Sequence, residues 1–205
     1  MVETGNDPTA TSFAWDIFVL AGNPNAHAAP DLRAGSSNVT TANTFNSPDG
    51  IGFDAFGRLW IQTDGNYSNV GDYAGQGNNQ MLAADPASKE IRRFLVGPSG
   101  CEVTGLTLTP DRRTMFINIQ HPGEVGSHPN KPAAYTGDNW IARNADQFST
   151  WPGGAGSGRP RSATVVIRRS DGRPIGDGDY VAPVSAAPIV PAGFIGGSGA
   201  PTGIG

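Results

Sequence analysis

An internal repeat with an offset of 55 residues sets the strongest limit on how this chain folds. Residues 50–54 (Gly-Ile-Gly-Phe-Asp) align with residues 105–109 (Gly-Leu-Thr-Leu-Thr). Residues 59–62 (Leu-Trp-Ile-Gln) then align with residues 115–118 (Met-Phe-Ile-Asn), after one extra residue in the turn between them. The β-rich runs are short and are bounded by residues that favour turns. A repeated unit of about 50 residues made of short strands is typical of a β-propeller blade.

The repeat predicts one complete blade over residues 45–97 and a second blade over residues 101–170 that lacks its outer strand. Residues 13–20 (Phe-Ala-Trp-Asp-Ile-Phe-Val-Leu) predict a further strand, which would be half a blade. Each blade buries its faces against its neighbours, and a ring needs four or more blades to close. We therefore expect an all-β chain whose residues 12–175 form a partial β-propeller of antiparallel four-stranded sheets, about two blades plus part of a third. Another chain or self-association would supply the missing blades.

Composition agrees with turn-rich β structure. The 205 residues include 29 Gly and 17 Pro, and only 16% are charged, which argues against helical bundles and coiled coils. Residues 1–11 are polar, and we expect them to be disordered. Residues 176–205 are rich in Gly, Pro and Ala and carry no charge from residue 181 onward, so a disordered tail is expected there.

Charge and hydropathy exclude two classes of partner. The 14 basic residues are scattered among 18 acidic ones and form no basic stripe, so nucleic acid is not expected as a partner. No apolar run is long enough to span a bilayer, so no membrane partner is expected, and the first residues lack the pattern of a secretory signal. The single cysteine, Cys101, excludes an internal disulfide. It is interpreted either as a small buried residue or as a thiolate ligand for a soft metal.

Two carboxylates are the main candidates for metal ligands. In a propeller the innermost strands line the central channel, and these strands are expected to begin near residues 48–50 and 101–105. The offset aligns Glu102 with Ser47, two residues before Asp49, and a spacing of two keeps side chains on one face of a strand. Asp49 and Glu102 are therefore expected to meet at the channel mouth, where their oxygens would suit calcium. The alternative is that Asp49 only shapes a Pro-Asp-Gly turn and Glu102 caps a strand or forms an ion pair.

Further candidates lie at the end of a predicted strand. His121 and Glu124 flank a Pro-Gly pair, and either side chain could bind a metal or contact a phosphate. The alternative for His121 is a hydrogen bond within the turn. His27 lies in a polar loop and is expected to be solvated. No catalytic residue is assigned.

Several of these runs resemble one family when taken together. Residues 43–50, 57–65, 101–105 and 115–124, which ends in Asn-Ile-Gln-His-Pro-Gly-Glu, resemble the C-terminal portion of PhoX-type alkaline phosphatases. The resemblance covers residues 13–175. It implies a six-bladed propeller that hydrolyses phosphomonoesters with calcium and iron in its channel, usually in the periplasm or outside the cell. It also implies that this chain is a C-terminal fragment that is inactive alone.

A second resemblance concerns one segment only. Residues 47–50 with residues 57–60 are similar to a metal-binding segment of gluconolactonase propellers, in which the Asp of Pro-Asp-Gly is a ligand. This similarity implies a metal role for Asp49. Two alternative functions follow, a metal-dependent lactone hydrolase and a non-catalytic propeller-like module that binds calcium or a partner.

Overall fold

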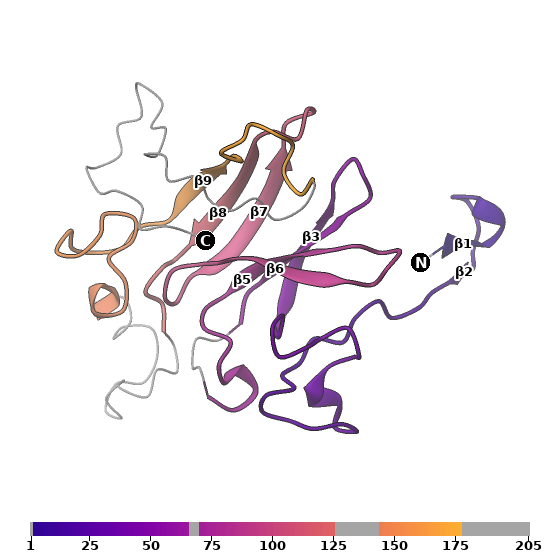
Figure 1. Cartoon of the computed structure of the whole chain (residues 1–205), viewed down its shortest axis with the longest axis horizontal. Helices are drawn as coiled ribbons and strands as arrows, with labels where there is room; N and C mark the ends of the chain where they lie inside the picture. The colour runs from indigo at the N-terminus through magenta and orange to yellow at the C-terminus, as the bar shows by residue number, and fades with distance from the viewer. Residues whose placement is uncertain (1, 66–69, 126–143, 178–205) are drawn as a thin grey trace.

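Two antiparallel sheets dominate the computed structural model, which describes residues 2–65, 70–125 and 144–177 (Figure 1). The first sheet has the order β3-β4-β5-β6, with bounds Pro48–Phe53, Leu59–Thr63, Gln80–Ala84 and Ile91–Val96. The second has the order β7-β8-β9, with bounds Glu102–Leu108, Met115–Gln120 and Ala163–Ile167. The helical elements of these ranges are short 3-10 turns, namely Thr4–Asn6, Leu32–Ala34, Gly71–Tyr73 and Ala145–Gln147. The expectation of an all-β chain is confirmed.

The first hairpin shows how local sequence sets the turns. The carboxylate of Asp54, at the end of β3, accepts hydrogen bonds from the backbone N–H groups of Phe56 and Arg58. Gly57 adopts a φ of 76°, a left-handed conformation that glycine enters without steric cost. The same carboxylate accepts a hydrogen bond from the indole of Trp60, and this bond ties the turn to the core strand β4.

The pairing register confirms the repeat. Ile51 pairs with Ile61 in the first sheet, and the residues aligned with them, Leu106 and Ile117, pair in the second. Both sheets also carry an irregularity at the matching place, just before Ile51 and just before Leu106. The first sheet has four strands and the second has three, as the sequence predicts. The closure of such sheets into a propeller stays a prediction.

The two sheets pack face to face through one apolar cluster. Trp60 and Met81 of the first sheet meet Val103, Met115 and Ile117 of the second, and each of these side chains is at most 1% exposed. The approach is close because the first sheet has a glycine on this face. A β-carbon added to Gly52 would lie 3.0 Å from the nearest side-chain atom of Leu106. A larger residue at this position would require the Leu106 side chain to shift.

The opposite face of the first sheet is covered by the segment that precedes it. Phe45, Ile61 and Leu82 form a second buried cluster, against which the partly buried Phe18 and Val19 pack. This coverage explains why all five residues of β4 are buried, whereas β8 alternates between buried and exposed residues.

The strand predicted over residues 13–20 is wrong beyond its first two residues. Only β2 (Phe13–Ala14) forms, and it pairs with β1 (Val2–Glu3) in a small unit that projects from the sheets (Figure 1). Trp15 and Ile17 are 69% and 50% exposed. An apolar run favours a strand, but a strand also needs a hydrogen-bonding partner, and none of the described segments forms a ladder with residues 15–20.

Both ends of the chain were expected to be disordered. The structure describes most of the N-terminal segment but little of the C-terminal tail. Residues 1–11, expected to be disordered, contain β1. Of the expected tail, residues 178–205 lie outside the described ranges. Asp177 forms an ion pair with Arg112 at 3.0 Å, and Ile175 is 2% exposed in the core between the sheets.

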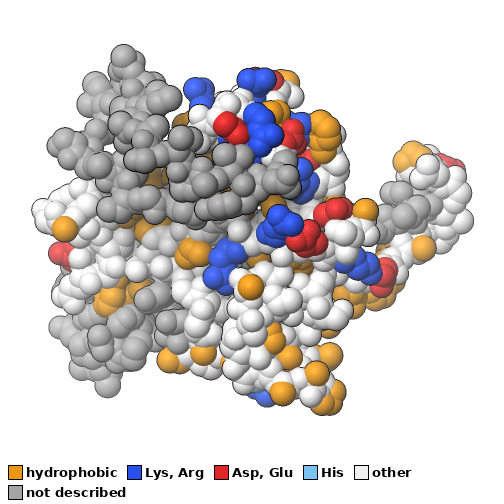
Figure 2. All heavy atoms as spheres, viewed as in Figure 1, with side chains coloured by type: hydrophobic (Ala, Val, Ile, Leu, Met, Phe, Trp, Pro, Cys, Tyr) orange, Lys and Arg blue, Asp and Glu red, His pale blue; other side chains and the backbone are white. Residues whose placement is uncertain are grey.

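On the face shown in Figure 2, basic and acidic side chains lie beside one another and do not form separate patches. Of the helices in the described ranges, none is long and apolar enough to cross a membrane.

Candidate metal centre

Three potential metal ligands meet at one end of the two sheets. Asp64, Glu102 and His121 each place a ligand atom within 4.8 Å of the others. Asp64 directly follows β4, Glu102 begins β7, and His121 directly follows β8. Because β4 and β8 are matching strands of the repeat, their last residues reach the same end when the sheets pack face to face.

Backbone pairing holds the two carboxylates in place. The N–H group of Asp64 donates to the carbonyl of Ser47 at 3.1 Å, one residue before β3 begins. Glu102 pairs with Gln120 at the corresponding place in the second sheet. Asp64 therefore follows the second strand of the β3–β4 pair, and Glu102 begins the first strand of the β7–β8 pair.

Both nitrogens of the His121 ring face polar groups. Its Nδ1 lies 3.1 Å from Oε2 of Glu124 and 3.3 Å from the carbonyl of Gly100, and its Nε2 lies 3.5 Å from Oε2 of Glu102. With the proton on Nδ1, the Nε2 lone pair faces the two carboxylates. A metal-binding histidine typically donates its other N–H to a carboxylate or carbonyl in this way.

The surroundings of the carboxylates differ. Glu102 is buried, with 8% of its surface exposed, whereas Asp64 is exposed. A buried carboxylate is costly unless a hydrogen-bond donor or a cation compensates for its charge. With its proton on Nδ1, His121 offers no donor to the Glu102 carboxylate, so a metal ion beside Asp64 would compensate for this charge.

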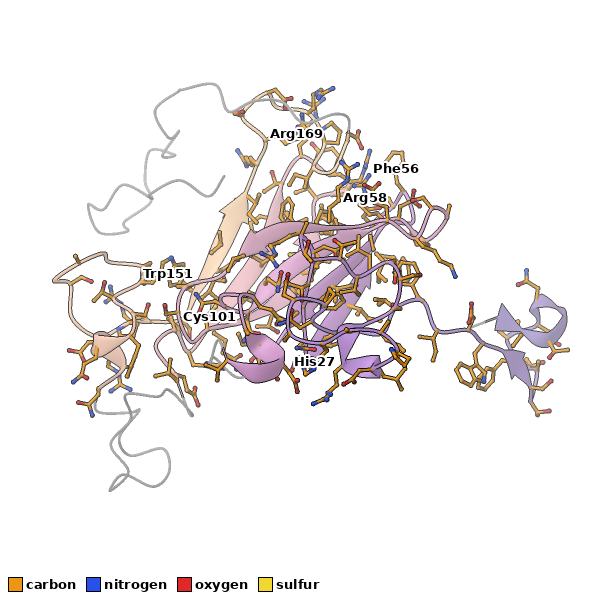
Figure 3. The ribbon with its side chains drawn as sticks, turned by 60° about the horizontal axis from the view of Figure 1, so that its bottom comes forward. His27, Phe56, Arg58, Cys101, Trp151 and Arg169 are labelled. Carbon is orange, nitrogen blue, oxygen red and sulfur yellow. The ribbon has the colours of Figure 1, made fainter. Side chains whose placement is uncertain are left out.

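Cys101 is interpreted as a small buried residue. Burial, with a smaller contribution from the charges of Glu102 and Asp64, raises the pKa of its thiol to about 12. The thiolate is the form that binds metals, and such a pKa keeps the thiol neutral near pH 7. Figure 3 shows Cys101 away from the turn residues Phe56 and Arg58.

The structure does not bring Asp49 to this group. Of the described residues, those that gather with Glu102 are Asp64 and His121, and Asp49 is an exposed residue of β3. The β3–β4 register shifts between Pro48 and Ile51, so the rule that side chains two apart share a face does not hold across Asp49. A metal role for Asp49 stays a prediction.

Asp64 was missed by the sequence argument, although a signal was present. Under the repeat offset Asp64 aligns with Gln120, the residue before His121. Asp64 and His121 directly follow the matching strands β4 and β8, at the same end of the sheets. A search of strand exits, in addition to strand entries, would have found it.

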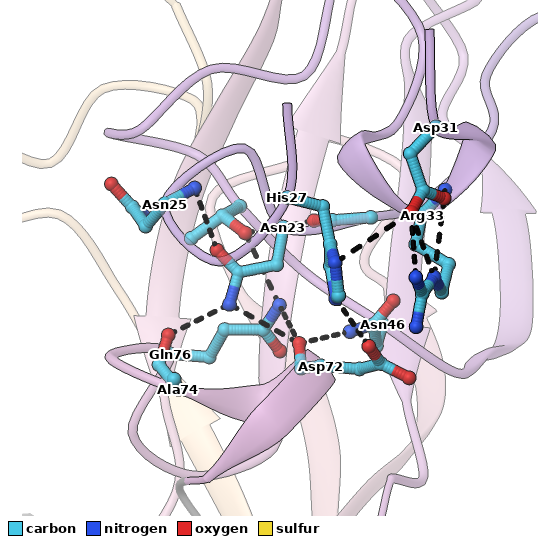
Figure 4. A network of polar contacts seen from close by, with 11 residues as sticks. Asn23, Asn25, His27, Asp31, Arg33, Asn46, Asp72, Ala74 and Gln76 are labelled. Carbon is cyan, nitrogen blue, oxygen red and sulfur yellow. Dashed lines mark hydrogen bonds and ion pairs between the residues drawn. The ribbon is translucent and has the colours of Figure 1, made fainter. Parts of the chain in front are cut away.

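His27 was expected to be solvated, and this expectation is wrong. The His27 side chain joins two segments of the chain. Its Nε2 contacts Oδ1 of Asp72, and its Nδ1 lies 3.8 Å from Oδ2 of Asp31 (Figure 4). The side chain of Asn23 donates to the carbonyls of Asp72 and Ala74 beside it. This network fastens the loop before β3 to the turn before β5 and offers no group for chemistry at the metal centre.

The donor set fits a metal ion of the kind expected. Carboxylate oxygens suit calcium, and an imidazole nitrogen suits iron and related transition metals. Two carboxylates and one imidazole are fewer than the six to eight oxygens that calcium takes. Further ligands must therefore come from water, substrate or other protein segments.

Comparisons with known proteins point to one family. The family model described as alkaline phosphatase PhoX matches residues 1–123. The solved structure described as Pseudomonas fluorescens PhoX in complex with vanadate, a transition state analogue, is 51% identical, with a TM-score of 0.71 over 85% of this chain. This chain spans 26% of that chain. A comparison with curated proteins gave no match.

Proposed function

Because this chain belongs to the PhoX alkaline phosphatase family, we propose that it takes part in metal-dependent hydrolysis of phosphomonoesters. The observation that supports this proposal is the meeting of Asp64, Glu102 and His121 at one end of the paired sheets. We assign these three side chains as metal ligands, and calcium, with iron beside it, as the metals. Family membership favours this function over a lactone hydrolase or a non-catalytic module.

Each residue has a distinct role in this proposal. Glu102 supplies a buried negative charge, and Asp64 supplies a second carboxylate on the side open to solvent. His121 presents Nε2 to both, while Glu124 and the carbonyl of Gly100 hold its other nitrogen. A bound metal would polarise the phosphoryl oxygens and activate the attacking nucleophile.

The proposed centre is incomplete with these ligands alone. Further blades of the same ring would supply the remaining ligands and the contacts to phosphate. We therefore expect the 205-residue chain to bind calcium weakly, with a dissociation constant on the order of 10⁻⁴ to 10⁻³ M. We also expect no appreciable turnover by this chain alone.

Calorimetric titration with calcium tests the ligand assignment. Asp64→Asn and Glu102→Gln should each weaken this binding strongly, because each removes one of two carboxylates. Asp49→Asn is the matched comparison, since Asp49 is a carboxylate outside the group. If Asp49→Asn abolishes binding and Asp64→Asn leaves it intact, the assignment is wrong and the site lies at Asp49.

Hydrolysis of p-nitrophenyl phosphate tests the expectation for the chain alone. No turnover above buffer with calcium and iron present is the expected result. Turnover that disappears in Glu102→Gln would show instead that the chain completes its own site, as a homo-oligomer or within one copy.

A further inference from the structure

One side chain links the loops that carry the two carboxylates. Asn79 lies in the segment before β5, and its amide uses all of its main hydrogen-bonding positions. Its Oδ1 accepts from the hydroxyl of Thr63 at 2.9 Å and from the N–H of Gly65 at 2.6 Å. Its Nδ2 donates to the carbonyl of Gly65 and to the carbonyl of Cys101, each at 2.8 Å.

These partners flank the proposed metal ligands in the chain. Thr63 and Gly65 are the residues before and after Asp64, and Cys101 is the residue before Glu102. A single amide thus bonds the backbone around one carboxylate, which belongs to the first sheet, to the backbone beside the other, which belongs to the second. The carbonyl of Asn79 also accepts from the N–H of Gly97, which fixes Asn79 itself at the end of β6.

Asp64 has need of such support. It lies beyond the last paired residue of β4 and is exposed, so packing does not fix its position. Its own N–H bond to Ser47 holds it to the first sheet only. The separation between the two carboxylates, which sets how well they share one ion, depends on a link between the sheets at this end.

We propose that Asn79 is a positioning residue for the metal centre, which sets the distance between Asp64 and Glu102. This inference rests on the proposed function. Asn79 is not a ligand, because both of its polar atoms are already engaged. It acts by limiting the motion of Asp64 relative to Glu102, and the loss of such supporting bonds typically weakens metal binding about 10-fold to 100-fold.

The chain contains a closely matched control. Asn43 has the same set of bonds, because it donates to the carbonyls of Asn38 and Ile91 and accepts from the N–H and hydroxyl of Thr40. It belongs to the side of the first sheet that residues 18–45 cover, and it has no bond to the metal group. Asn43→Ala should therefore lower the melting temperature as Asn79→Ala does, without affecting metal binding.

Terbium ion can be used as the probe, because its luminescence reports binding and its lifetimes in water and deuterium oxide report the number of bound water molecules. In the full chain, Asn79→Ala should weaken terbium binding about 10-fold. It should also add about one bound water, as Asp64→Asn does, because a poorly held carboxylate leaves a coordination position to solvent. The double variant should bind no more weakly than Asp64→Asn alone, because both substitutions remove the same ligand.

The possible outcomes separate the two proposals. If the unsubstituted chain binds no terbium, the metal centre is refuted, and the role of Asn79 with it. If it binds terbium and Asn79→Ala matches Asn43→Ala in affinity and bound water, only the role of Asn79 is refuted. Should Asn79→Ala fail to fold, Asn79→Gln carries the same expectation, because it keeps the amide and displaces it by one methylene.

Discussion

The Nε2 atom of His121 lies 3.5 Å from Oε2 of Glu102, although one residue begins a hairpin and the other follows its last strand. Antiparallel pairing of β7 with β8 places the start of one strand beside the end of the other. The hairpin therefore brings an imidazole to a buried carboxylate, and packing against the first sheet adds Asp64.

Glu124→Gln should weaken metal binding by about 10-fold to 100-fold. The Glu124 carboxylate lies 3.1 Å from Nδ1 of His121, and a neutral amide would hold the ring less firmly and favour the Nδ1 proton less. Calorimetry with calcium and with ferrous ion measures the change. Glu90→Gln is the control, because Glu90 is an exposed carboxylate paired with Arg92 on another hairpin. Equal affinities for the two variants would contradict a supporting role for Glu124.

Gly123→Ala should destabilise the chain by about 3 kcal/mol or more. Gly123 has a φ of 87°, and a β-carbon there would lie 2.5 Å from the backbone carbonyl oxygen of Ala145. Gly154→Ala is the matched control, because its φ is 78° and nothing lies within 4 Å of the added atom. Gly154→Ala should lower the free energy of unfolding by about 1 to 2 kcal/mol, the cost of placing a side chain in the left-handed conformation. Urea unfolding measures both, and similar losses would show that residue 145 does not press on Gly123.

Asp31→Asn should make the chain less sensitive to acid. Hydrogen bonds from the Arg33 side chain and backbone lower the pKa of Asp31 from 3.8 to about 2. A lowered pKa in the folded chain means stabilisation that is present above pH 3.8 and is lost as the pH falls towards about 2. Melting temperatures compared across that window should fall less steeply in the variant. A parallel decline in both proteins would count against this pairing.

The double substitution Ile51→Thr/Phe53→Thr should reduce self-association. Ile51 and Phe53 are 69% and 65% exposed on β3, whereas the residues aligned with them in β7 are partly buried against the core between the sheets. In β7 this apolar face packs against the neighbouring sheet, whereas in β3 it is exposed to solvent. An exposed apolar face of this kind favours association. Sedimentation velocity over a range of concentrations measures it, with Leu32→Thr, a single exposed leucine, as control. A compact monomer at all concentrations for the unsubstituted chain would overturn the prediction.

The strands of the two sheets could be predicted from the sequence because they depend on short-range patterns. The repeat offset aligned Ile51 with Leu106 and Ile61 with Ile117, and in the structure the Ile51–Ile61 pair of one sheet recurs as Leu106–Ile117 in the other. Turn residues such as Gly57 act through their own backbone preference, which needs no knowledge of distant segments. Glu102 and His121 could be named as candidates for the same reason, because they border strands that the pattern defines.

Tertiary structure decided which side chains gather at the candidate metal centre. The register shift in β3 removes the face rule that pointed to Asp49, and the packing of one sheet on the other brings Asp64 to Glu102. His27 likewise depends on Asp72, which is 45 residues away. Sequence patterns determine which residues a strand pairs and buries, because those follow from local backbone geometry. Which side chains meet beyond the strand ends depends on how two sheets pack, and that is a property of the whole core.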